Sequence, residues 1–366
     1  MSTELDRTER LLGQSLTRHA ADAPFDGPLL TAVHARLRRR RRTRTIGAAV
    51  LASASVAAAF VVATAIGDHA GPSRSPAVAS DGRSPADATD GWRWESYGGI
   101  EVQVPSAWGY TGDPSQPCLA EPGARPFVRR PGPSTAVGCA HELPALNSRA
   151  AYASFGPGHG GTKTFDRDWV RETRVVAGTA LTVLADDPAL RRRILGSARA
   201  ISGTDVYGCT PSHPAAFRPT ERPQDNGGLA AVGSIESVSV CSYSFVSLEP
   251  DPAPPLYSGR RLTGPDAARL VEAITAAPEG SGPNDPSTCL PDYWGDRIYV
   301  LVVRGSAREQ QVLVRYAACH HNGTDDGTVQ RQLTAEVLRP LLTGPDALGG
   351  MSGVVGRLLH PDQPVK

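Results

Sequence analysis

One uncharged apolar run, residues 46–66, constrains this chain more than any other feature of its sequence. The run is twenty-one residues long, and about 20 apolar residues suffice for a helix to cross the hydrocarbon core of a bilayer. Seven arginines between Arg36 and Arg44 precede it, and basic residues beside an apolar span hold that end in the cytoplasm. The sequence therefore predicts a single-pass transmembrane helix in the plasma membrane, with a cytoplasmic N-terminus and an extracytoplasmic C-terminal region.

A cleaved signal peptide is the alternative for the same run. Ala63, Thr64 and Ala65 form an A-x-A-like cleavage site. However, the run exceeds the 7–15 apolar residues of a typical signal peptide, and 45 residues precede it. We therefore expect an uncleaved anchor. The arginines before it should contact anionic headgroups, which makes membrane lipid a predicted partner of the apolar helix and of Arg36 to Arg44.

Residues 1–45 are predicted to be a basic cytoplasmic arm. They carry ten arginines against five acidic residues, a net charge of +5 in a chain whose total is +1, so the remainder carries −4. A nucleic-acid-binding protein would carry basic charge on its folded domain, and nucleic acid is therefore not an expected partner. Leucines at helical spacing predict helix in the arm, either within a tether or as a hairpin that binds a cytoplasmic regulator. The leucines of the first predicted helix are Leu5, Leu11, Leu12 and Leu16.

All six cysteines follow the apolar run: Cys118, Cys139, Cys209, Cys241, Cys289 and Cys319. An even number on one side of the run is typical of disulfides in an oxidising compartment. No C-x-x-C pair is present, so zinc fits less well. The spacings form three well-separated couples and predict the disulfides 118–139, 209–241 and 289–319.

The rest of the chain predicts a flexible linker and two α+β domains. Residues 67–91 are rich in Pro, Ser, Ala and Asp and have almost no side chain to bury, as linkers do. Residues 92–202 and 203–366 each combine strand and helix patterns, which favours mainly antiparallel sheets covered by helices. The predicted strands are 93–97, 100–104, 169–176, 179–184, 235–245, 297–304 and 311–318. Three helices are predicted. The first begins near Pro188 with Asp187 as its cap, the second spans 267–277, and the third spans 335–339 with Thr334 as its cap.

A spacing echo runs through the second predicted domain. The hexapeptide LTGPDA at 262–267 recurs at 342–347, eighty residues later, and Cys209 and Cys289 have the same offset. A degenerate tandem repeat would explain both observations. Chance or codon bias is the alternative, because the residues between these points match poorly.

Catalytic motifs are missing from the sequence. It contains no G-x-S-x-G, S-x-x-K or H-E-x-x-H. The glycine-rich segment 156–164 lacks a lysine directly after its last glycine, so we interpret it as a surface loop rather than a phosphate loop. We therefore expect no catalytic residue, no cofactor and no enzymatic activity.

Three further groups of residues have a functional and a structural interpretation. His320 and His321 follow Cys319, but adjacent side chains of a strand point to opposite faces, and no acid among Asp292, Asp325 and Asp326 is aligned with them as a metal ligand. No metal site is therefore predicted. Asn322-Gly323-Thr324 matches a glycosylation sequon but is interpreted as a turn. Trp92, Trp94 and Trp108 would line a groove for a sugar or peptide, although aromatic residues near hairpins more often belong to the core.

Three segments of the chain resemble one group of proteins. They are LLGQSLTRHAA (11–21), WRWESYGGIEVQVPSAWGY (92–110) and VRYAACHHNGTDDGT (314–328). With the arginine run before an Ala/Val anchor, they resemble uncharacterised actinobacterial single-pass membrane proteins, often found beside group-IV (extracytoplasmic-function) sigma factors. The V-P-x-x-W after a strand and the ALRRRILGSAR helix make the first domain similar to PsbP/Mog1-type α+β folds.

That resemblance implies a link to envelope signalling and no defined activity. The arm contains His19 and His34 but no cysteine, so the H-x-x-x-C-x-x-C mechanism of zinc-type anti-sigma factors is excluded. We predict a non-enzymatic membrane protein whose disulfide-braced exterior binds an envelope ligand or senses a condition. The alternative is a membrane-tethered cell-envelope hydrolase, which would need His320 or His321 beside a carboxylate in a pocket.

Overall fold

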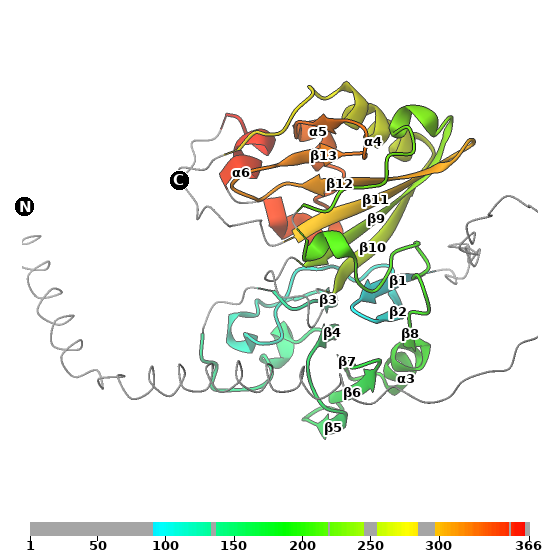
Figure 1. Cartoon of the computed structure of the whole chain (residues 1–366). Coiled ribbons are helices and arrows are strands. Elements are labelled where there is room, and N and C mark those ends of the chain that lie inside the picture. Colours follow the sequence, from blue (N-terminus) through cyan, green and yellow to red (C-terminus); the bar gives the residue numbers. More distant parts are fainter. Residues whose placement is uncertain are drawn as a thin grey trace, which may run out of the picture. The chain divides into compact units, whose positions relative to one another are not determined.

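The computed structural model describes part of the chain. The described residues are 91–132, 137–218, 220–244, 255–284, 297–350 and 353–362, without the side chains of 348–350. They all belong to one compact unit, Ala79–Lys366. Within these residues the strands form three sheets, with few helices between them (Figure 1).

The described part of the chain is therefore mostly β-structure, and the predicted α+β class is wrong. Only α3 (Pro188–Ser197) and α4 (Gly264–Ala276) are ten residues or longer among its helices. The prediction missed strands that lack a clear apolar alternation. For example, β10 (Leu256–Thr263) has the sequence LYSGRRLT, whose glycine and two arginines hide its strand character.

The first two sheets lie before residue 201. Strand β1 (Trp92–Tyr97) pairs with β2 (Ile100–Pro105) as a hairpin around Gly98 and Gly99, as the sequence predicts. The short β8 (Arg199–Ala200) adds to β2. The second sheet has the order β3-β4-β7-β6-β5, comprising Phe127–Arg129, Tyr152–Gly156, Thr179–Ala185, Val170–Val176 and Gly161–Thr164. Its β3–β4 pair is parallel and its other pairs are antiparallel.

Helix α3 covers one face of the five-stranded sheet. Val128, Ala153 and Val183 lie in register across β3, β4 and β7 and share a buried cluster with Ile194 and Leu195 of α3. The helix begins at Pro188, where the Asp187 side chain accepts a hydrogen bond from the Ala189 N–H at 2.7 Å. Successive strand residues point to opposite faces, so the residues next to this row face away from α3.

The third sheet has six strands in the order β10-β9-β11-β12-β13-β14. Besides β10, they are β9 (Ile235–Ser244), β11 (Arg297–Gly305), β12 (Glu309–Arg315), β13 (Gly323–Asp325) and β14 (Gln330–Arg331). Helix α4 packs on β9 and β10 through Leu270, Val271 and Ile274. The shorter α5 (Ala335–Leu338) packs against α4, and α6 (Gly353–Leu359) packs against α5. Thr334 caps α5 as predicted.

The two copies of LTGPDA share a local conformation and differ in their surroundings. Gly264 and Gly344 have φ values of 54° and 60°, and each begins a helical segment, α4 and the 3-10 helix η6 (Gly344–Gly350). Asp266 in the first copy is exposed and pairs with Arg269. Asp346 in the second copy is fully buried. The echo thus marks two similar helix starts, and the tandem repeat stays a prediction.

The described residues contain two disulfides, where three were predicted. Cys118 pairs with Cys139 and Cys209 with Cys241, as the spacing predicts, each with a Cα–Cα distance of 5.5 Å. Cys289 lies outside the described residues, so the third predicted pair stays a prediction. Cys319, its predicted partner, is buried and is not a free thiol.

No helix in the described ranges is long and apolar enough to cross a membrane. The longest, α4, has 13 residues and rises only about 20 Å, against a hydrocarbon core of about 30 Å. The predicted transmembrane helix 46–66, the arm 1–45 and all of the linker 67–91 except Gly91 lie outside the described residues. The prediction of a single-pass protein in the plasma membrane is corrected by this finding.

A buried ion pair joins the first hairpin to the six-stranded sheet. Glu95 is 3 % exposed and accepts hydrogen bonds from Arg130 at 2.5 Å, Arg93 at 2.6 Å and the Tyr110 hydroxyl at 2.6 Å. Burial by itself would raise the pKa of Glu95, but Arg130 and Arg93 outweigh it and lower the pKa. Arg130 also donates to the Tyr257 carbonyl on β10 at 2.6 Å. This pair therefore fixes β1 and β3 to β10.

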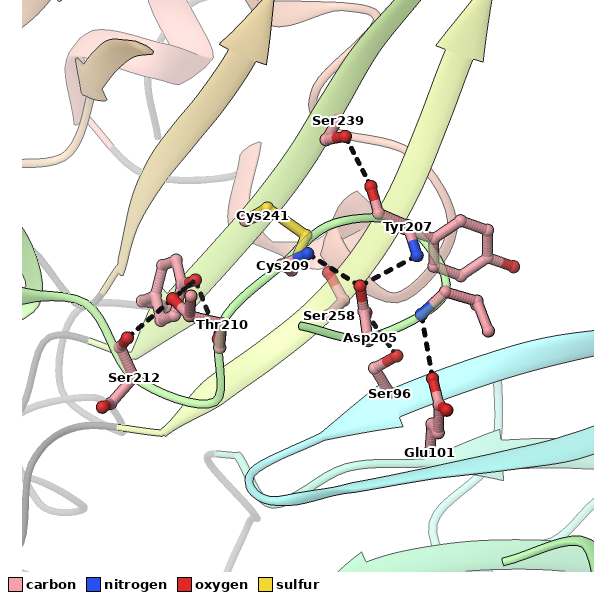
Figure 2. Close-up of a disulfide and its surroundings, with 12 residues drawn as sticks. Ser96, Glu101, Asp205, Tyr207, Cys209, Thr210, Ser212, Ser239, Cys241 and Ser258 are labelled. Atoms are coloured by element: carbon pink, nitrogen blue, oxygen red, sulfur yellow. Dashed lines mark hydrogen bonds between the residues drawn. A yellow bond between two sulfur atoms is a disulfide. The ribbon is translucent and has the colours of Figure 1, made fainter. Parts of the chain in front are cut away.

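Figure 2 shows a second buried junction, beside the Cys209–Cys241 disulfide. One oxygen of Asp205 accepts from the backbone N–H groups of Tyr207 and Cys209, at 2.9 and 2.8 Å. The other accepts from the Ser96 hydroxyl of β1 at 2.6 Å. Burial raises the pKa of Asp205 to about 6, and these hydrogen bonds oppose the rise only in part.

Replacing Gly259 with alanine is expected to destabilise the fold by about 1–3 kcal/mol. A Cβ atom at this position of β10 would clash with the Asp205 carboxyl group and lie 3.2 Å from the Cys209 Sγ atom. Thermal unfolding measures the loss. Gly196→Ala on α3 is the control: a Cβ there meets nothing within 4 Å, so helix propensity should make it neutral to stabilising by up to about 1 kcal/mol. Equal stability of the two variants would contradict the clash.

Candidate functional site

An apolar row forms the floor of a cavity on the face of the five-stranded sheet opposite α3. Phe127 of β3, Tyr152 of β4 and Leu184 of β7 lie in register on neighbouring strands, and all three line the cavity. The rings of Phe127 and Tyr152 stack at 5.5 Å between centroids. Because these residues alternate with the row that faces α3, the same strands supply both a core and the floor of the cavity.

Two loop segments wall this cavity, which we call the Tyr152 pocket. Its volume is about 450 Å³, within the range of small-molecule sites. One wall comes from Thr111 to Arg125 and includes the 3-10 helix η2 (Pro117–Leu119). The other comes from Glu142 to Ala150 and includes η3 (Leu146–Ser148). Leu119 lines the pocket and is 56 % exposed, so an apolar side chain stands at the mouth.

Charged side chains at the rim occur largely as ion pairs. Asp113 pairs with Arg129 at 3.1 Å. Glu142 pairs with Lys163 at 2.7 Å and with Arg171 at 3.2 Å, and Lys163, then Arg171, lower the pKa of its carboxyl group. These two carboxylates are neutralised by neighbours, and the other charged lining residues, Glu121 and Arg125, carry opposite charges, so the rim adds little net charge to the cavity.

The Cys118–Cys139 disulfide connects the two walls. Cys118 lies in η2 between two lining residues, Pro117 and Leu119. Cys139 lies shortly before the lining residues Glu142 and Leu143. The Cys118 N–H donates a hydrogen bond to the Cys139 sulfur at 3.2 Å. The disulfide thus links the two wall segments, whose cysteines are 21 residues apart in the sequence.

Arg149 anchors the second wall. Its guanidinium group donates to the Pro144 carbonyl at 3.2 and 3.3 Å and pairs with Asp166 at 2.9 Å. It also lies over the Trp169 ring, 5.5 Å from the centroid. A backbone bond from the Gly123 N–H to the Asn147 carbonyl, at 2.8 Å, joins this wall to the first. These contacts between protein groups hold the two walls in place around the cavity.

The residues considered for hydrolysis lie elsewhere, in the loop around β13. His321 and Asp325 both line a polar hollow of about 150 Å³. The Asp325 carboxylate accepts two hydrogen bonds from Arg222, at 2.7 and 2.9 Å, and others from Gly327 and Gln330. Burial tends to raise the pKa of Asp325, but these bonds lower it. Asp325 is thus held as a structural anion, and this geometry does not favour a hydrolase.

The neighbouring loop residues also have structural roles. Asp326 accepts from the N–H groups of Leu229, Thr328 and Val329 at 2.7–3.0 Å. Asn322 is fully buried and bonds both the N–H and the carbonyl of Ala318, in agreement with a turn rather than an accessible sequon. Asp292 lies outside the described residues. Among the residues that the structure describes, no cluster of His, Cys, Asp or Glu could hold a metal ion.

The tryptophans and the glycine-rich segment do not form a site. Trp94 and Trp108 are both 7 % exposed, and Arg193 covers Trp92 at 3.8 Å from the ring centroid. These positions agree with the core interpretation. Gly161–Thr164 form the exposed edge strand β5, which is followed by another strand, whereas a phosphate loop leads into a helix.

The Tyr152 pocket was not predicted from the sequence. Its floor residues are separated by 25 and 32 positions, and neither β3 nor β4 was recognised as a strand. The disulfide pair Cys118 and Cys139 was the one available signal, because it indicates that the enclosed segment has a defined shape. Which residues that segment covers depends on the sheet order.

Comparison of the chain with protein-family models, with curated proteins and with solved structures finds no match in any of the three. The resemblances to actinobacterial membrane proteins and to PsbP/Mog1-type domains therefore stay predictions. The predicted arm, where a cytoplasmic regulator was expected to bind, lies outside the described residues. The Tyr152 pocket is the feature of the described residues that bears on function.

Proposed function

We propose that this chain is a non-enzymatic binding protein that takes a small, largely apolar ligand into the Tyr152 pocket. The observation that carries the proposal is the in-register row Phe127, Tyr152 and Leu184 at the floor of a cavity of about 450 Å³. Ligand sites are typically concave, mainly apolar and formed in advance. Here the cavity is concave and its floor is apolar.

The chemistry of the rim supports binding rather than catalysis. Asp113 and Glu142 are each paired with cations. A general base needs a carboxylate or imidazole placed to take a proton from substrate, and two of the three carboxylates that line the pocket, Asp113 and Glu142, are paired with arginine or lysine. The stacked rings of Phe127 and Tyr152 offer a flat surface, which favours a ligand with an aromatic or fused-ring body.

Replacing Leu119 with glutamate is expected to weaken binding of the neutral apolar dye Nile red by about tenfold or more, a change of about 1.4 kcal/mol. The carboxylate would stand at the mouth of the pocket and would lose hydration when an apolar ligand enters. Leu119 is already 56 % exposed, so the substitution should leave the fold intact. Fluorescence titration of the folded protein measures the dissociation constant.

Leu146→Glu is the matched control. Leu146 is 49 % exposed and also lies in a 3-10 helix, but it does not line the pocket. This variant adds the same charge to the same half of the molecule and should bind the dye like the parent. If both variants bind dye equally, or if the parent binds none, the Tyr152 pocket is not the ligand site.

A further inference from the structure

The two described disulfides differ sharply in their access to solvent. Cys209 and Cys241 are 0 % and 1 % exposed and belong to a buried cluster with Tyr243 and Leu256. Cys118 is exposed and Cys139 is partly exposed. Thiol–disulfide exchange requires a thiolate to reach a sulfur atom, and exposed disulfides are the ones that exchange readily. A reductant therefore has access to one disulfide and not to the other.

The two sulfur atoms of the exposed disulfide also differ in their expected roles during exchange. The Cys118 N–H donates to the Cys139 sulfur at 3.2 Å, and a hydrogen bond of this kind stabilises negative charge on the acceptor. Cys139 is thus the better leaving thiolate, because this N–H stabilises the charge that develops on its sulfur atom. Cys118, the more exposed residue, is the sulfur open to attack.

We propose that Cys118–Cys139 is a thiol–disulfide exchange site through which a dithiol reductant loosens the walls of the Tyr152 pocket. The exchange site rests on the exposure of Cys118 and on its hydrogen bond to Cys139, and its effect on ligand binding rests on the proposed function. It responds to dithiols such as a reduced CxxC-type partner or a small dithiol in solution.

The reaction balances as a two-electron exchange. One thiolate of the dithiol attacks Cys118, a mixed disulfide forms, and the Cys118–Cys139 bond breaks to release Cys139 as a thiolate, which takes up a proton. The second thiolate of the reductant then attacks its own sulfur in the mixed disulfide. Cys118 leaves and is protonated. The protein gains two thiols, and the reductant becomes a cyclic or intramolecular disulfide.

Reduction should loosen the pocket without unfolding the protein. The walls keep the Gly123–Asn147 backbone bond and the Arg149–Pro144 contacts, and the floor belongs to a sheet whose other face is the α3 core. What is lost is the covalent link next to Leu119. The expected result is a weaker site on an intact fold.

The first test is mild reduction of the folded chain with dithiothreitol, followed by a pulse of iodoacetamide and mass mapping. Cys118 and Cys139 should be alkylated about tenfold sooner or more than Cys209 and Cys241, because access governs exchange. A circular dichroism spectrum taken before alkylation shows whether the fold persists. Equal labelling of both pairs while the fold persists would overturn the exchange site.

The second test measures Nile red binding in the oxidised, the reduced and the reoxidised protein, and in the Cys118→Ser/Cys139→Ser double variant. Reduction and the double variant should each weaken binding several-fold, and reoxidation should restore it only in the parent. If Leu119→Glu weakens dye binding but reduction does not, the pocket is the ligand site and control of binding by disulfide exchange is wrong. If Leu119→Glu has no effect, the proposed function fails, and the alkylation rates alone decide the exchange site.

Discussion

Replacing Glu95 with glutamine is expected to lower the free energy of unfolding by about 3–5 kcal/mol, the usual cost of breaking a buried ion pair by removing one partner. Glutamine keeps the shape of the side chain and removes its charge. Arg130 is 3 % exposed and would then be a buried cation without an anion. Urea unfolding at neutral pH, followed by circular dichroism, measures the loss.

Glu309→Gln is the matched control for this substitution. The Arg304–Glu309 and Arg93–Glu95 pairs have the same Nε–Oε distance of 2.6 Å, but the Glu309 side chain is 48 % exposed and that of Glu95 is 4 % exposed. Exposed pairs contribute about 0–1 kcal/mol. If the two variants lose equal stability, burial does not govern the Glu95 interaction. Adding Arg130→Met to Glu95→Gln should recover part of the loss, since the fully buried cation is then removed and only the partly exposed Arg93 has lost its anion.

Replacing Asp205 with asparagine is expected to raise stability at neutral pH by up to about 3 kcal/mol, because one pKa unit corresponds to about 1.4 kcal/mol. Burial raises the pKa of Asp205 from 3.8 to about 6. The folded state therefore binds its proton more tightly than the unfolded state, and the parent loses stability as pH rises from about 4 to about 6. Asparagine mimics the protonated form: its oxygen can accept from Tyr207 and Cys209, and its NH₂ can donate to Ser96.

The pH series tests the sign of this effect. The difference in unfolding free energy between Asp205→Asn and the parent should be small near pH 4 and should grow until about pH 6.5. Nearby charged groups, Glu101 on β2 and Arg261 on β10, are the same in both proteins, so the difference isolates Asp205. Asp266→Asn, at an exposed carboxylate of α4, should show no such growth. A difference that stays constant from pH 4 to pH 7 would contradict a raised pKa.

The predicted features that the structure confirms are local ones. The β1–β2 hairpin turns at Gly98 and Gly99, and α3 begins at Pro188 with Asp187 as its cap. Glycine pairs and helix caps act over a few residues, so a short window of sequence contains the information. The pairs Cys118–Cys139 and Cys209–Cys241 close loops of 21 and 32 residues, which are the shortest pairings open to those cysteines.

The predictions that failed needed information from distant residues. The strand β3 has three residues and no alternating pattern of its own. Its pairing with β4 is parallel and non-local, and parallel neighbours are joined by long connections. Because β3 and β4 are missing from the sequence prediction, it contains too few strands, and it does not include the floor of the pocket.

The sequence by itself thus determined the turns, the helix starts and the nearest cysteine pairs, because each depends on the conformational preferences of a few neighbouring residues. The tertiary structure alone decided that Phe127, Tyr152 and Leu184 form one apolar row and that Glu95 and Arg130 meet out of water. Sheet order and burial result from many weak contacts among residues far apart in the chain. A phenylalanine that packs in a core and one that lines a ligand pocket look the same in the sequence.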